Sequence, residues 1–103
     1  MDVDNEYLDD PEFQLLIRKY LKYLLESLRE VKSNLDNRDF EKLRLFGHGL
    51  KGAAGGYGFD DFSKMGSKIE TASLSENIDY LKNLISDFEA ALKKEYQRSE
   101  KKL

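Results

Sequence analysis

His48 is the only histidine in a chain of 103 residues that contains no cysteine. A neutral imidazole keeps a lone pair on one ring nitrogen, so a single histidine can act as a nucleophile or as a proton carrier. The absence of cysteine excludes thiol nucleophiles and disulfides, and one histidine cannot build a multi-histidine zinc site. We therefore expect neither a metal centre nor a cofactor within the chain.

The segment around His48 is unusually rich in glycine. Six of the seven glycines fall at positions 47–58, although a glycine inside a helix costs about 1 kcal/mol relative to alanine. On a helical wheel His48 lies opposite the apolar stripe of this segment, on the same face as Gly52 and Gly55. The surface beside the imidazole is therefore predicted to be bare of side chains, so that another molecule can approach it closely.

Two basic residues flank the same face. Arg44 precedes His48 by four residues and Lys51 follows it by three, which are the spacings of neighbouring side chains on a helix. Their positive charges can stabilise an anion held at the imidazole. The pattern is typical of an exposed nucleophile in a cationic setting.

The residues that follow the histidine carry a recognisable motif. Residues 48–52 read His-Gly-Leu-Lys-Gly, and Gly58 lies ten residues after the histidine. This pattern resembles the H-x-L-K-G…G signature of histidine-containing phosphotransfer (HPt) domains. The resemblance implies that His48 is phosphorylated on its outer ring nitrogen and that Lys51 lies close enough to interact with the phosphoryl group. It also implies that Gly52 leaves room for a receiver domain.

The helical wheel and the resemblance together suggest roles for the residues around the motif. The docking face for the receiver domain is expected to comprise three residues: Arg44, Gly52 and Gly55. Gly58 is expected to have a structural role. Gly47 and Gly49 depart from the family pattern, in which bulkier residues commonly flank the histidine, and they predict a locally more flexible helix.

Glu70, which lies 22 positions after His48, is the expected partner of the imidazole. In HPt-like domains, including the phosphotransfer domain of chemotaxis kinases, a polar residue at this spacing hydrogen-bonds the inner ring nitrogen. A carboxylate that accepts the Nδ1 proton fixes the tautomer and exposes Nε2 for attack. Glu70 is therefore expected to orient and activate the imidazole. Ser63, Gly66 and Ser67 lie on a similar face, and their small size is expected to let the two helices approach.

Four segments with helical periodicity are expected to position these residues. Apolar side chains recur in each of them at steps of three and four residues. The predicted helices cover residues 11–33, 38–55, 60–73 and 76–98. Asp10 and Pro11 are start signals for the first helix, and Ser75 is the candidate cap of the last. The inward stripe of the first helix is predicted to include Leu16 and Ile17.

The short connections between these segments favour antiparallel neighbours. The expected fold is therefore all-α, a single domain over residues 1–103 that forms an up-down-up-down four-helix bundle. Tyr7 and Leu8 are compatible with a short additional helix at the N-terminal end.

Charge and hydropathy limit the expected partners and location. A net charge of −3, with acidic residues spread along the chain, offers no basic field for nucleic acid. No apolar run approaches the roughly 18 residues of a membrane span, and no leader pattern is seen, so a cytoplasmic location is expected. The glycine run lacks the G-x-x-x-x-G-K-[ST] pattern of a nucleotide-binding loop. No ATP-dependent kinase activity is therefore expected of the chain.

Together with the resemblance, these features predict a phosphorelay intermediate. His48 would accept a phosphoryl group from a kinase or a receiver-domain aspartate and donate it to the aspartate of a response-regulator receiver. The expected partners are a receiver domain that brings its own Mg²⁺ and a histidine kinase or hybrid kinase, with the chain itself monomeric. Two alternatives stay open: a non-catalytic helical docking module for a receiver domain, and a domain excised from a larger chemotaxis-type kinase.

Overall fold

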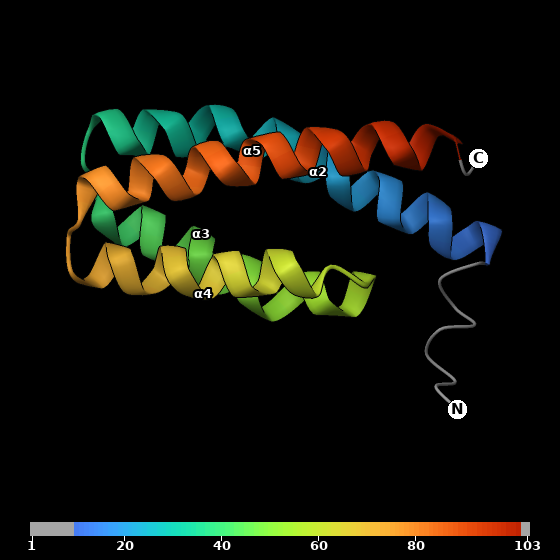
Figure 1. Cartoon of the computed structure of the whole chain (residues 1–103), viewed down its shortest axis with the longest axis horizontal. Helices are drawn as coiled ribbons and strands as arrows, with labels where there is room; N and C mark the ends of the chain where they lie inside the picture. Colours follow the sequence, from blue (N-terminus) through green and yellow to red (C-terminus); the bar gives the residue numbers. More distant parts are fainter. Residues whose placement is uncertain (1–9, 102–103) are drawn as a thin grey trace.

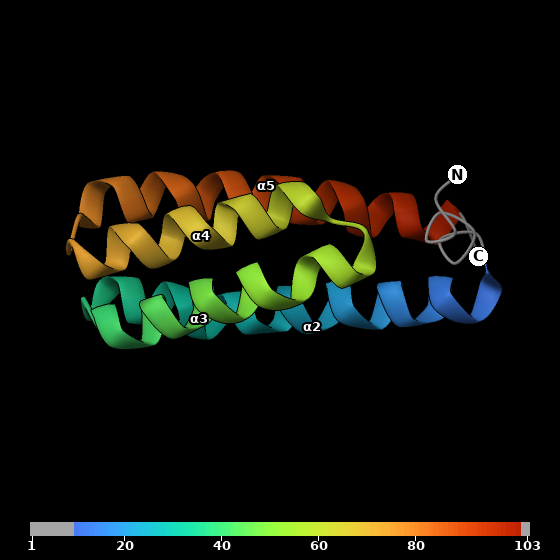
Figure 2. The ribbon, with the colours of Figure 1, turned by 90° about the horizontal axis from the view of Figure 1, so that it is seen from below.

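The computed structural model describes residues 10–101, which form four α-helices and one short 3₁₀ helix. These elements are α2 (Pro11–Asp36), α3 (Phe40–Ala53), η1 (Ala54–Tyr57), α4 (Asp60–Leu74) and α5 (Ile78–Lys101). Figures 1 and 2 show the four helices side by side, with consecutive helices running in opposite directions. The predicted all-α four-helix bundle is confirmed. The additional helix suggested around Tyr7 and Leu8 falls outside the described residues.

The four helices differ in length. Helices α2 and α5 contain 26 and 24 residues, whereas α3 and α4 contain 14 and 15. The long pair therefore extends past the short pair at the end of the molecule where η1 lies (Figure 2). None of the helices within residues 10–101 combines the length and apolar character needed to cross a membrane.

The start of α2 follows the sequence signals. The side chain of Asp10 accepts a hydrogen bond of 2.8 Å from the backbone N–H of Glu12, and Pro11 occupies the first helical position. At the start of α3, Asp39 caps the backbone N–H of Lys42 in the same way. Both aspartates satisfy amides that have no partner within the helix.

The prediction that Ser75 caps the last helix is wrong. Ser75 instead ends α4, where its backbone N–H bonds to the carbonyl of Thr71. Glu76 then adopts a left-handed φ of 54°, which reverses the chain, and α5 begins only at Ile78. The capping oxygen comes from Asn77, whose side chain accepts from the backbone N–H of Tyr80 at 3.2 Å.

Replacing Asn77 with alanine is expected to lower the free energy of unfolding by about 1 kcal/mol, because the first turn of α5 loses its side-chain acceptor. Urea denaturation followed by circular dichroism measures this change. Ser75→Ala serves as the control, since the Ser75 hydroxyl bonds to carbonyls at the end of α4 and does not cap α5. A larger loss for Ser75→Ala than for Asn77→Ala would contradict this account of the turn.

Aromatic and aliphatic side chains from all four helices fill the core of the bundle. Phe88 is fully buried and packs edge-on against the rings of Phe46 and Phe62. The prediction that Leu16 lies inside is wrong, since 51% of this residue is exposed. It sits one position before the buried Ile17 and so points about 100° away from the inward direction.

Candidate functional site

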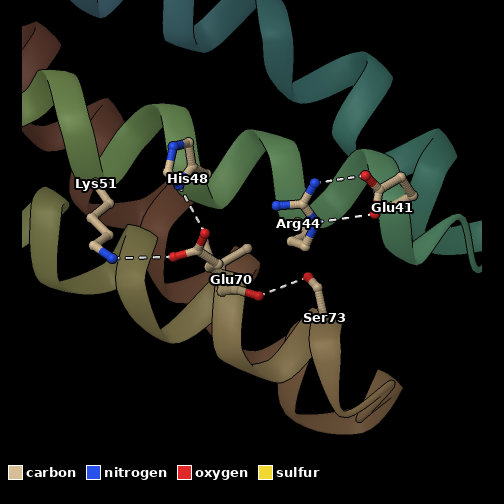
Figure 3. Close-up of polar contacts among 7 residues, drawn as sticks. Glu41, Arg44, His48, Lys51, Glu70 and Ser73 are labelled. Atoms are coloured by element: carbon tan, nitrogen blue, oxygen red, sulfur yellow. Dashed lines mark hydrogen bonds and ion pairs between the residues drawn. The ribbon is translucent and has the colours of Figure 1, made fainter.

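His48 lies on the exposed face of α3, as the helical wheel predicts. Its side chain is 65% exposed, whereas Leu43, Gly47 and Leu50, which face the rest of the bundle, are buried. Figure 3 shows the ring on the flank of α3 that neighbours α4. The imidazole can therefore be reached from solvent without any movement of the bundle.

Glu70 of α4 holds the inner nitrogen of the imidazole. His48 Nδ1 lies 2.8 Å from Glu70 Oε2 (Figure 3). An ionised carboxylate only accepts hydrogen bonds, so Nδ1 carries the proton and Nε2 carries the lone pair of the neutral ring. In Figure 3 the second ring nitrogen points away from Glu70. The structure thus brings together the two residues that the sequence spacing paired.

Lys51 contacts the other oxygen of the same carboxylate. Its Nζ lies 3.3 Å from Glu70 Oε1, and the Glu70 side chain is only 17% exposed. The hydrogen bond from His48, with a further contribution from Lys51, holds the pKa of Glu70 below its ordinary value. Glu70 is therefore an anion at neutral pH that serves the imidazole and the ammonium group together.

The pKa of Glu70 leads to a test of this geometry. A carboxylate whose pKa is lowered by folding contributes its full stabilisation above its unfolded pKa and loses it as the pH falls through the folded pKa. An NMR titration of the Glu70 carboxyl carbon should therefore give a midpoint below the ordinary value of 4.5. In His48→Ala the midpoint should move back toward that value. A wild-type midpoint at or above 4.5 would show that the carboxylate is not engaged.

Two glycines set the distance between α3 and α4. A Cβ atom on Gly47 would lie 2.6 Å from the backbone nitrogen of Glu70 and 2.8 Å from the carbonyl oxygen of Gly66. A Cβ atom on Gly66 would lie 2.5 Å from the backbone nitrogen of Lys51. The two backbones therefore touch directly, which lets the short side chains of His48 and Glu70 meet.

The role of Gly47 differs from the one inferred from the sequence, which linked this glycine to local flexibility. Gly47 is buried in the helix contact. The signal for this role was present in the wheel, because Gly47 lies four residues after Leu43 and three before Leu50 on the inward stripe. Gly49 has open space around its missing side chain.

The small residues of α4 contribute unequally to the approach of the helices. Gly66 lies in the backbone contact itself. The hydroxyl of Ser63 donates a hydrogen bond of 2.7 Å to the carbonyl oxygen of Lys51, which ties the last turn of α3 to α4. Ser67 is half-buried.

The glycines after His48 leave the surface open. A Cβ atom on Gly52 would have no neighbour within 4 Å, and one on Gly55 would lie 3.7 Å from a carboxylate oxygen of Asp60. Gly58 has a left-handed φ of 89° and its N–H bonds to the carbonyl of Gly55. Glycine adopts this conformation without a steric penalty, so Gly58 ends η1.

Arg44 is engaged by a residue that the sequence interpretation missed. Its Nε and Nη2 lie 3.0 and 2.6 Å from the two carboxylate oxygens of Glu41. The spacing of three residues on a helix was the available signal for this pair. Within residues 10–101, no group of acidic and histidine side chains is arranged to hold a metal ion.

The arrangement can deliver a nucleophile. Nε2 of His48 carries a lone pair toward solvent, the carboxylate of Glu70 stabilises the positive charge that the ring acquires when Nε2 forms a bond, and Lys51 lies beside the carboxylate. These are the elements of nucleophilic catalysis by an activated imidazole.

Comparisons with known proteins agree with this geometry. The family model described as "Hpt domain" matches residues 15–99. No curated protein and no solved structure gives a significant match to the chain. The matched span covers most of the chain and includes His48, Lys51 and Glu70. The chain therefore belongs to the Hpt domain family, whose members act in histidine phosphotransfer.

Proposed function

We propose that this chain is a phosphorelay intermediate in which His48 carries the phosphoryl group between two partner proteins. The observation that carries the proposal is the hydrogen bond between His48 Nδ1 and Glu70 Oε2, on a histidine whose side chain is 65% exposed. The general role in phosphotransfer follows from the family. The residues and the direction of each step are our proposal.

In the accepting step, Nε2 of His48 attacks the phosphorus of an aspartyl phosphate on a receiver domain, or the γ-phosphorus of ATP held by a kinase. The N–P bond forms as the bond between phosphorus and the donor oxygen breaks, and the receiver's carboxylate or ADP is released. The proton on Nδ1 stays in place, so the ring becomes positively charged, and Glu70 balances that charge. In the donating step, the carboxylate of a receiver aspartate attacks the phosphorus and the N–P bond breaks.

Lys51 has a second role in this proposal. In the free protein its ammonium group pairs with Glu70. When a phosphoryl group with two negative charges forms on His48, the ammonium group moves toward the phosphoryl oxygens, since positioned cations stabilise the charge on a phosphoryl group in transfer. The remaining cation, Mg²⁺, comes with the receiver domain.

The docking face that we propose for the receiver comprises Arg44, Gly52 and Gly55. The open space around Gly52 allows the backbone of the partner to approach the imidazole. We propose that the chain acts as a monomer and has no ATP-dependent kinase activity of its own.

Incubation with a receiver domain that carries a radioactive aspartyl phosphate tests the proposal. The chain should acquire a label that is labile in acid and stable in base, as expected of phosphohistidine. The label should then pass to a second, unphosphorylated receiver when Mg²⁺ is present. No labelling across a panel of receiver domains would contradict the proposal and favour the non-catalytic docking module.

A further inference from the structure

Arg44 lies between two carboxylates. It forms two hydrogen bonds with Glu41, through Nε and Nη2. Figure 3 shows its third guanidinium nitrogen pointing away from Glu41, toward the side on which Glu70 and His48 lie. The hydrogen bond from Arg44 to Glu41 raises the pKa of the guanidinium above its ordinary value, and the negative charge of Glu70 adds a smaller effect of the same sign. Arg44 therefore lies within electrostatic range of Glu70.

A freed Arg44 would compete for the Glu70 carboxylate. Both oxygens of Glu70 already have a partner. Oε2 is bonded to Nδ1 of His48, and Oε1 is bonded to Nζ of Lys51. A guanidinium group can bind both oxygens of a carboxylate at once, and its planar donors fit a carboxylate better than an ammonium group does. Arg44 on Glu70 would weaken the hydrogen bond to Nδ1 and reduce the negative charge that Glu70 presents to the ring.

We propose that Glu41 is a positioning residue that holds Arg44 away from Glu70 and so reserves the Glu70 carboxylate for His48 and Lys51. The inference rests on the proposed function only in treating His48 as the nucleophile. Glu41 acts through Arg44 and does not touch the imidazole. Its effect should therefore disappear when Arg44 loses its charge.

The experiment compares wild type with Glu41→Gln, with Arg44→Gln and with the double variant Glu41→Gln/Arg44→Gln. The first measurement is the ¹⁵N–¹H spectrum of the imidazole at a pH where the ring is neutral. Because His48 is the only histidine, its ring signals do not overlap with those of another imidazole, and they report the tautomer directly. The second measurement is the initial rate at which phosphoramidate, a small phosphoryl donor, labels the protein.

Glu41→Gln should lower the population of the Nδ1–H tautomer and slow the labelling about two- to fivefold, the range set by the energies of exposed ion pairs. The double variant should restore the tautomer population, and it should be labelled at the same rate as Arg44→Gln, since both lack the positive charge of Arg44. It also controls for the loss of an acidic residue from the first turn of α3, since Glu41→Gln and the double variant share that change. Glu95→Gln is the matched control and should change neither value, because Glu95 pairs with Arg98 at the same spacing on α5.

Two results would overturn the inference. One is a Glu41→Gln variant in which the population of the Nδ1–H tautomer equals that of wild type. The other is a double variant whose Nδ1–H tautomer population is as low as that of Glu41→Gln, which would mean that Glu41 does not act through Arg44. If phosphoramidate fails to label even the wild type, the proposed function is contradicted, while the tautomer comparison still decides the role of Glu41.

Discussion

Replacement of His48 with glutamine is expected to reduce the acid-labile label on the protein to background. The label arises only if a nitrogen with a free lone pair attacks phosphorus, and the amide nitrogen of glutamine has no such lone pair. The chain contains no second histidine that could substitute. Labelling with a phosphorylated receiver or with phosphoramidate, followed by acid and base treatment, measures the effect.

Glutamine is the suitable substitution because its amide can still donate a hydrogen bond to Glu70. The substituted side chain is also exposed, so the circular dichroism spectrum and the urea midpoint should stay close to those of wild type. This separates loss of the nucleophile from loss of the fold. An acid-labile label that survives in a folded His48→Gln protein would show that another residue carries the phosphoryl group.

The second large effect is expected for Gly47→Ala. The new methyl group would meet the backbone of Glu70 and of Gly66 at 2.6 and 2.8 Å, and backbone atoms cannot rotate away as a flexible side chain can. The helices must separate, at a cost of about 1–3 kcal/mol for overpacking. The separation should also weaken the hydrogen bond between His48 and Glu70 and so slow phosphorylation.

Gly49→Ala is the matched control for this prediction. It makes the same substitution two residues later in the same helix, where the methyl group enters open space. The gain in helix propensity, about 1 kcal/mol, is common to both variants and cancels in their comparison. Gly49→Ala should therefore be more stable than wild type, and Gly47→Ala should be less stable than Gly49→Ala by the cost of overpacking. Equal stability of the two variants would rule out a rigid contact at Gly47.

The positions of the helices were predictable because each one buries a single stripe of side chains, and the period of such a stripe can be read directly. The pairing of His48 with Glu70 was predicted from the resemblance to HPt domains, in which a polar residue at this distance from the histidine binds the inner ring nitrogen. The sequence did not reveal the turn before α5, because a left-handed conformation at Glu76, with φ of 54°, has no reliable marker in a residue other than glycine. The burial of a single residue such as Leu16 depends on the angle at which α2 meets its neighbours.

The parts of the site that escaped prediction depend on contacts between helices. Gly47 was visible as an anomaly in α3, but its reason lies in the backbone of α4, which is distant in sequence. Glu41 was three residues from Arg44, yet exposed helices contain many such pairs, for example Glu95 with Arg98. What distinguishes this pair from Glu95 and Arg98 is that the charge of Glu70 also acts on Arg44.

The contact of Gly47 with Gly66 has a consequence for how the site responds to change elsewhere in the protein. The spacing between α3 and α4 at the imidazole is defined by main-chain atoms, which have no alternative rotamers. Thermal exchange of side chains in the core, or substitution of one core residue by another of similar size, therefore has little means of altering the separation of His48 and Glu70. The reactive geometry is therefore expected to depend more on these two glycines than on the particular side chains that fill the interior.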